Sequence, residues 1–160
     1  MIKITKPLLK KALVAGFFST LTIGALTLLT YKSTLGYFIA ASFGSSMVLL
    51  FGFPESPFAQ PKNVFFGHVL TAIVGVIFVH FIPLPIYINI ALGVGAGVCL
   101  MILFNVVHPP AGGNPIAIMI GGVSFPFLIF PIMAGAVTII VGGIIYNSLI
   151  LKRKYPVSWK

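Results

Sequence analysis

The octapeptide His108-Pro109-Pro110-Ala111-Gly112-Gly113-Asn114-Pro115 interrupts a sequence that is otherwise almost continuously apolar. Proline has no backbone N–H, and the residue before a proline avoids the helical region, so one continuous helix does not pass through this stretch. Unpaired backbone groups do not face lipid hydrocarbon. If its flanking segments span a membrane, the octapeptide is therefore buried in protein or lines a watery cavity.

The composition indicates a membrane protein. Of 160 residues, 59% are hydrophobic and 7% are charged, namely ten Lys or Arg and one acid, Glu55. An ordinary soluble domain carries about 25% charged residues, which excludes a soluble enzyme and a disordered chain. Since a membrane helix needs about 20 apolar residues, we expect an all-α, polytopic helical membrane protein in which residues 1–160 form a single transmembrane domain.

The apolar stretches between breakers number six. They are residues 12–30, 35–53, 64–82, 86–106, a short stretch at 114–123, and 126–151. Residues 71–77 match residues 138–144 in five of seven positions, and Gly44-Ser45-Ser46 aligns with Gly113-Asn114-Pro115. We therefore predict two structural repeats, about 12–82 and 86–151, each a long helix, a short Gly- or Pro-interrupted helix and a long helix. In transporters such paired interrupted segments indicate the binding site.

The basic residues predict the topology. Four of them, Lys3, Lys6, Lys10 and Lys11, precede the first segment, and Lys152, Arg153, Lys154 and Lys160 follow the last. Basic flanks stay on the cytoplasmic side, so we expect the cell membrane, both termini in the cytoplasm and an even number of crossings. Two solutions remain, namely four crossings with two re-entrant segments, or six crossings with inverted halves. Lys62 would be cytoplasmic in the second, which slightly favours six.

The two interruptions predict an anion site. Gly112 and Gly113 leave the backbone accessible, and Asn114 and Pro115 suit the N-cap and first position of a short helix running to about Gly121. A helix start carries partial positive charge and free N–H donors. Residues 42–46 offer a second such start. The predicted substrate-binding residues are Ser42, Gly44, Ser45, Ser46, His108, Pro109, Pro110, Ala111, Gly112, Gly113 and Asn114. The alternative is that both segments are close-packing corners between helices.

Two histidines suggest proton coupling. An ionisable residue inside a membrane segment is a functional hypothesis by default, and the ordinary pKa of histidine lies near 6.5. His108 either binds the anion when protonated or fixes the chain break by bonding a carbonyl group. His68 either faces the same cavity or makes an interhelical hydrogen bond. Cys99 stands alone, so we expect no disulfide, no metal site and no cofactor, and interpret it as a buried hydrophobe.

At these motifs the chain resembles the HPP family of integral membrane proteins, named for the tripeptide His108-Pro109-Pro110. The resemblance includes residues 108–114, 41–46, 54–57, 60–63 and Gly67-His68, and extends from about residue 35 to 150. It implies four membrane helices and transport, and some plastid and cyanobacterial members of the family move nitrite.

Three functions are compatible with the sequence. The favoured one is a carrier or channel, passive or proton-coupled, for a small inorganic anion, because helix starts suit an anion whereas one acid is too few for a cation pore. A second is an intramembrane hydrolase that pairs Ser45 or Ser46 with His68 or His108, but no acid orients the histidine. A third is a non-transporting scaffold subunit. We do not expect an enzyme, and the expected partners are the anion, lipids and a second copy of the chain, without nucleic acid.

Overall fold

The computed structural model describes residues 4–34 and 36–158 and is helical, without strands in those ranges. The six α-helices in them are α1 (Lys6–Lys32), α2 (Ala41–Met47), α3 (Pro61–Phe81), α4 (Ile86–Leu103), α5 (Asn114–Gly121) and α6 (Ala134–Ile144). Wider π-type turns extend α2 through Val48–Gly52 and α6 through Leu128–Met133 and Ile145–Ile150. Short 3-10 turns occupy Pro57–Ala59 and Pro109–Gly113. The predicted all-α class is confirmed. Lys3 and Lys160 lie outside the described residues.

Four helices are long and apolar enough to cross a bilayer. They are Lys6–Lys32, Pro61–Phe81, Ile86–Leu103 and Leu128–Ile150. The apolar helix over Ala41–Gly52 is shorter, and α5 has eight residues, or about 12 Å at 1.5 Å per residue. The two predicted short segments are therefore short helices, as expected.

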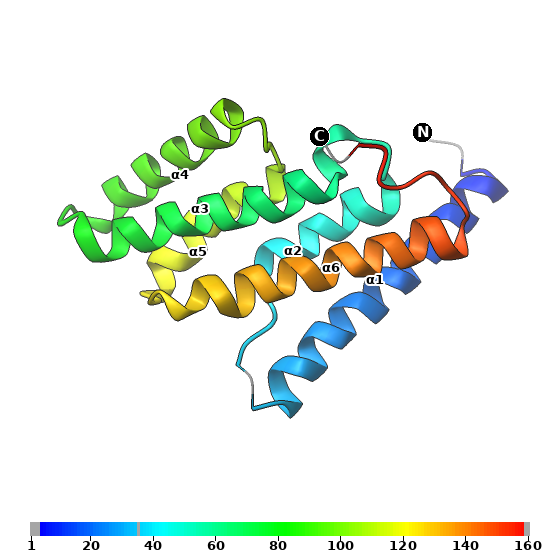
Figure 1. Cartoon of the computed structure of the whole chain (residues 1–160), viewed down its shortest axis with the longest axis horizontal. Helices are drawn as coiled ribbons and strands as arrows, with labels where there is room; N and C mark the ends of the chain where they lie inside the picture. The colour runs from blue at the N-terminus through cyan, green and yellow to red at the C-terminus, as the bar shows by residue number, and fades with distance from the viewer. Residues whose placement is uncertain (1–3, 35, 159–160) are drawn as a thin grey trace.

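Contacts between loops define two ends of the bundle. At the end that holds both termini, which we call the terminal end, the Tyr155 hydroxyl donates to the Ala59 carbonyl at 2.7 Å and the Asn63 amide donates to the Val107 carbonyl at 2.9 Å. At the opposite end, which we call the far end, Phe38 packs on Phe130 with ring centroids 5.0 Å apart. Figure 1 shows both termini on the same side of the molecule.

The chain passes between these ends six times. The long helices make four passes; the other two combine residues 36–40 with α2, and residues 104–113 with α5. Residues 36–40 are non-helical, and residues 104–113 end in the 3-10 turn Pro109–Gly113. This path resembles the six-crossing alternative of the sequence analysis, with Lys62 at the terminal end; the number of membrane crossings stays a prediction. The sequence repeat stays a prediction; the equal order and opposite directions of the two halves agree with it.

Close packing places the short helices against the long ones. A Cβ atom at Gly75 of α3 would lie 3.0 Å from the Ile118 side chain and 3.1 Å from the Pro115 Cα of α5, and one at Gly135 would lie 2.2 Å from the Phe43 ring of α2. These glycines let α5 approach α3 and α2 approach α6. The short helices are thus fixed by packing, as helices of this length must be.

Helix α1 is held less tightly than the others. Its buried residues are Thr22 and Leu26, whereas α3 buries nine. It crosses the bundle obliquely (Figure 1), and a groove of about 720 Å³ separates it from α2. The groove is lined mostly by small and hydroxyl side chains, among them Gly16, Ser19, Thr20, Gly24, Thr27, Gly44 and Gly52.

Candidate functional site

The starts of α2 and α5 meet in the middle of the bundle. The Ser42 hydroxyl donates a 2.7 Å hydrogen bond to the Asn114 side-chain oxygen, which joins the first turn of α2 to the first residue of α5. Asn114 in turn contacts His68 and Thr71, the eighth and eleventh residues of the 21-residue α3. The two interrupted segments that the sequence pairs are thus in contact, about halfway along a long helix.

Both short helices begin without a side-chain cap. The residues at the cap positions, Ala40 and Gly113, offer no side-chain acceptor, and no capping hydrogen bond forms there. The first N–H groups of a helix lack intrahelical acceptors and give its start partial positive charge. This applies to the start of α2, whereas α5 continues from the 3-10 turn Pro109–Gly113, whose Ala111 carbonyl accepts the Asn114 N–H.

The prediction that Asn114 is the N-cap of α5 was wrong. Gly113 occupies that position, and Asn114 is the first helical residue, with its backbone N–H donating to the Ala111 carbonyl. Its side chain turns away from its own helix because α2 and α3 supply better partners. The prediction that α5 ends at Gly121 agrees with the structure, since Gly122 adopts a left-handed conformation with φ of 56°, a common way to end a helix.

The Asn114 amide connects three helices. Its nitrogen lies 3.1 Å from each of three acceptors, namely the Nδ1 atom of His68, the His68 carbonyl and the Thr71 hydroxyl. The Thr71 hydroxyl donates to the Gly67 carbonyl at 2.8 Å and so accepts from Asn114. Because all acceptors face the nitrogen and the Ser42 hydroxyl faces the oxygen, the orientation of the amide is determined.

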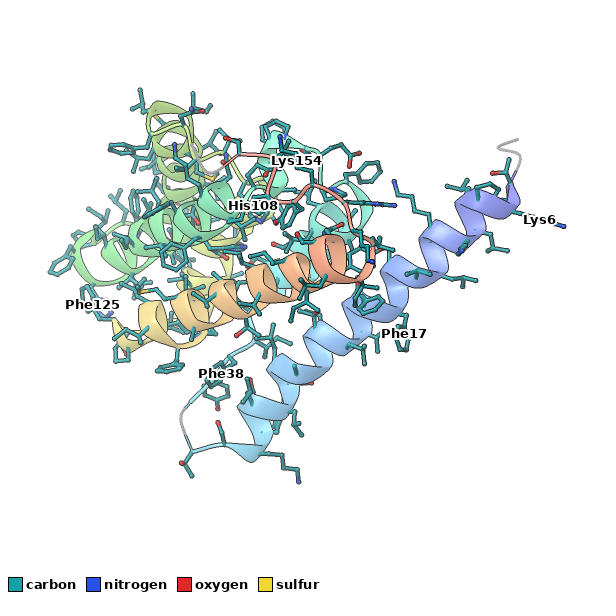
Figure 2. All side chains as sticks on the ribbon, turned by 45° about the vertical axis from the view of Figure 1, so that its right-hand side comes forward. Lys6, Phe17, Phe38, His108, Phe125 and Lys154 are labelled. Carbon is teal, nitrogen blue, oxygen red and sulfur yellow. The ribbon has the colours of Figure 1, made fainter. Side chains whose placement is uncertain are left out.

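Ser46 bridges the two histidines. Its Oγ atom lies 3.1 Å from the Nε2 atom of His68 and 2.8 Å from the Nε2 atom of His108. All three side chains have 0% exposure. The Nδ1 atom of His108 lies 2.7 Å from the Phe58 carbonyl, in the loop before α3. Figure 2 shows His108 in the interior of the bundle, far from both Lys6 and Phe125.

These partners determine the tautomer of each neutral ring. A carbonyl only accepts, so the Nδ1 atom of His108 carries the hydrogen and its Nε2 atom accepts from Ser46. An amide nitrogen does not accept, so the Nδ1 atom of His68 is bare and its Nε2 atom donates to Ser46. The result is a directed chain of hydrogen bonds from Asn114 through His68, Ser46 and His108 to the Phe58 carbonyl.

A glycine and an aromatic ring shape the histidine pair. A Cβ atom at Gly67 would lie 2.8 Å from the His108 Cβ, so only glycine lets residue 108 approach α3 this closely. The Phe43 ring meets the His68 ring edge-on with centroids 5.0 Å apart. The two imidazoles are themselves 4.9 Å apart.

The other predicted site residues lie around this network. Ala111 is buried, while Pro110 and Gly112 are half-buried. The exposed ones are Gly44, Ser45, Pro109 and Gly113. No atom other than local backbone lies within 4 Å of a Cβ built at Gly44, Gly112 or Gly113, so these glycines border open space. The site thus has a buried half, which contains the histidines, and an exposed half, which contains the glycines.

Thr71 and the Phe58 carbonyl complete the network and were not among the predicted site residues. Thr71 follows His68 by three positions, which places both on one face of α3. This spacing was the sequence feature from which Thr71 could have been predicted as a site residue. The Phe58 carbonyl is a backbone group in a loop, so no side-chain pattern reveals it. His80, by contrast, stacks on Phe125 at the far end with centroids 5.3 Å apart and takes no part in the site.

This architecture defines a polytopic membrane protein with two broken passes that meet midway, the arrangement that places binding sites in secondary transporters. The chain belongs to the HPP transmembrane family. A family model described as the HPP transmembrane region matches residues 4–156, nearly the whole chain.

Two relatives are transmembrane proteins of Dictyostelium discoideum. One is 33% identical over 128 residues, covering 76% of this chain and 45% of that protein; the other is 32% identical over 151 residues, covering 88% and 49%. The chain thus spans about half the length of the curated relatives it matches. No solved structure matches the chain.

We predict that Asn114→Ala destabilises the fold more than any other single change in the network. It removes the acceptor of the Ser42 hydroxyl and the donor to the His68 Nδ1 atom and to the Thr71 hydroxyl, and an unsatisfied buried group costs about 1–3 kcal/mol. Thermal unfolding in detergent measures the effect, with Ser45→Ala as the control because Ser45 is exposed. Equal unfolding temperatures for the two variants would contradict the assigned role of Asn114.

Proposed function

We propose that this protein is a membrane transporter or channel for a small inorganic anion, with nitrite as the first ion to test. The observation that carries the proposal is the open start of α2, which meets the start of α5 midway through the bundle through the bond between Ser42 and Asn114. Helix starts attract anions through free N–H groups and the helix dipole. Membership of a family regarded as transporters supports the same function.

The proposed anion position is the exposed half of the site at the start of α2, where Gly44 lines the groove between α1 and α2 and Gly113 borders open space before α5. These glycines leave the backbone of both helix starts open, and Ser42 supplies a half-buried hydroxyl. Glu55, the only acid in the chain, is exposed in the loop before α3. An anion at the start of α2 therefore meets the partial positive charge of that helix and no opposing carboxylate from Glu55.

We further propose that the terminal end faces the cytoplasm. The described basic residues at that end are Lys6, Lys10, Lys11, Lys62, Lys152, Arg153 and Lys154, whereas Lys32 closes α1 at the far end. Cytoplasmic loops carry the excess of Lys and Arg. The asymmetry supports the expected cytoplasmic location of both termini, and the cell membrane stays the proposed site of action.

A second copy of the chain is the proposed partner. Pro109 and Gly113, in the irregular segment before α5, and Ala41, Gly44 and Ser45 of α2 are exposed halfway along the bundle. Irregular backbone at this depth is tolerated only against protein or a water-filled cavity, and small residues favour close helix contact. We propose that the second copy covers this face and closes the anion site.

The hydrolase alternative has one observation in its favour, the 2.8 Å distance between Ser46 and His108. Both side chains are fully buried, and the carbonyl of Phe58, rather than a carboxylate, orients the histidine. A substrate therefore has no access to the hydroxyl. The proposed function is accordingly transport without enzymatic activity. A non-transporting scaffold role would be favoured over transport only if the purified protein moves no ion.

Bulk at the exposed glycines is predicted to block transport without unfolding the protein. Gly113→Leu and Gly44→Leu place a side chain in open space beside the helix starts, so nitrite uptake by proteoliposomes should fall to that of protein-free vesicles. Gly95→Leu is the matched control, because Gly95 is an exposed glycine of α4 with no neighbour within 4 Å. Wild-type uptake in both variants would refute the site.

Cross-linking tests the proposal that a second copy of the chain covers this face. We predict that Ser45→Cys in a Cys99→Ala background forms a disulfide-linked dimer when membranes are oxidised, because Ser45 lies on the proposed shared face. The sequence-based expectation that Cys99 is buried was wrong, because its thiol is exposed on α4. The parent chain, which retains only this thiol, is therefore the control for cross-linking away from the proposed face. A variant that stays monomeric while the parent cross-links would place the interface elsewhere.

A covalent probe separates transport from hydrolysis. A fluorophosphonate labels an activated serine, and we predict no labelling of the parent protein, because Ser46 is buried. The double variant Ser45→Ala, Ser46→Ala is the control. Labelling of the parent that disappears in the double variant would favour the hydrolase.

A further inference from the structure

The Ser46 hydroxyl has three hydrogen-bond partners but only one hydrogen to donate. Besides the two histidine nitrogens, its Oγ atom lies 3.2 Å from the carbonyl of Ser42, one turn earlier on α2. A hydroxyl donates one hydrogen and accepts up to two. The single Ser46 hydrogen therefore has two acceptors within reach, the Nε2 atom of His108 and the Ser42 carbonyl.

These two acceptors define two complete hydrogen-bond patterns. In the first, both rings are neutral and Ser46 donates to His108. In the second, the Nε2 atom of His108 carries an added proton and donates to Ser46, while the Ser46 hydrogen turns to the Ser42 carbonyl. His68 donates to Ser46 in both. No buried polar group loses its partner in either pattern, which would otherwise cost about 1–3 kcal/mol.

The added proton has one suitable place. On His68 the bare nitrogen is Nδ1, which faces the Asn114 amide nitrogen at 3.1 Å, so a proton there would point at another donor. On His108 the bare nitrogen faces a hydroxyl that is able to turn. The geometry therefore selects His108 over His68.

The charge of a protonated His108 lacks a partner in the protein. The described groups that face its ring are Ser46 from α2, His68 from α3 and the Phe58 carbonyl from the loop, and none carries a negative charge. The single acid, Glu55, is exposed. A buried unpaired charge is costly, so the second pattern becomes stable only when a negative charge from outside the protein binds nearby.

From these observations we propose that the protein carries one proton together with each anion, with the Nε2 atom of His108 as the proton site and the Ser46 hydroxyl as the group that turns. The proposal rests on the anion site described above. The anion at the start of α2 lies one helical turn from Ser46 and supplies the missing charge. The proton adds to the nitrogen lone pair, no covalent bond breaks, and the loaded site has no net added charge.

Transport measured against membrane potential tests this coupling. Proteoliposomes hold a pH-sensitive dye, nitrite is added outside, and valinomycin with potassium gradients sets the potential. We expect one proton to enter with each nitrite and the rate to be unchanged by a potential of either sign. Vesicles with the Gly113→Leu variant measure the leak of neutral nitrous acid, which is subtracted.

Variants of Ser46 test the turning hydroxyl. Ser46→Ala removes it at similar volume, and we expect the proton-to-nitrite ratio to fall at least tenfold, with any remaining flux dependent on potential. Ser46→Thr retains a hydroxyl and should restore the ratio, and His80→Gln is the histidine control. A merely structural Ser46 would change the rate and leave the ratio at one.

The protonation of the rings is a second, independent measurement. In protein with ¹⁵N-labelled histidine, the His80→Gln and His68→Gln variants assign the ring signals. We expect neutral His108 with hydrogen on Nδ1 in the absence of nitrite and a doubly protonated ring at saturating nitrite. A ring that stays neutral with nitrite bound overturns the proposal, even where Ser46→Ala does not fold.

The outcomes separate this proposal from the proposed function. Nitrite flux that depends on potential and brings no proton overturns the coupling and leaves the anion transporter intact. Coupled flux that persists in Ser46→Ala overturns the role of Ser46. Absence of flux for nitrite, nitrate, formate and chloride alike overturns the anion transporter, and the coupling with it.

Discussion

The side-chain amide of Asn114 is the interaction on which the centre of this molecule depends. It accepts from Ser42 of α2 and donates to His68 and Thr71 of α3. Helix α5 has eight residues and would not form alone, because a helix this short is marginal without tertiary support. The amide, together with the close approach at Gly75, fixes the start of α5 and thereby the position of both broken passes.

The same network explains how polar groups persist in an apolar bundle. Ser46, His68, His108 and Asn114 are buried, and a buried polar group without a partner is costly. Each ring nitrogen of the two histidines has one partner of the correct donor or acceptor type. Low polarity around such a network strengthens its bonds and raises the cost of any defect. The arrangement therefore tolerates few substitutions.

The sequence was sufficient for the class of fold, and it paired two interrupted segments that the structure brings into contact; that they form a binding site stays a prediction. The prolines and glycines of residues 108–115 predicted a break there, and the paired short segments predicted that 42–46 would belong to the same site. The first follows from local chemistry, since proline and glycine act on the backbone wherever they occur, and the second follows from the internal repeat in the sequence. Family membership, expected from the same motifs, was confirmed.

The partners within the site were beyond prediction. Ser46 and His108 are 62 residues apart, so only the packing of α2 against the octapeptide brings them together. Asn114 was predicted as a helix cap because local rules favour it, and tertiary partners override such rules. The number of passes stayed open because an extended residue advances about 3.3 Å and a helical one about 1.5 Å. A stretch too short to span as a helix thus completes a pass when part of it is extended.

The opposite directions of α2 and α5 have a consequence for the proposed transporter. The two short helices begin at the centre of the bundle and end at different faces. If the protein moves an anion, the lysines at the terminal end would raise the local anion concentration at one mouth and change rates, while the equilibrium would be unaffected. Net flow would then follow the solute gradients alone, and the protein would work equally well as an importer or an exporter.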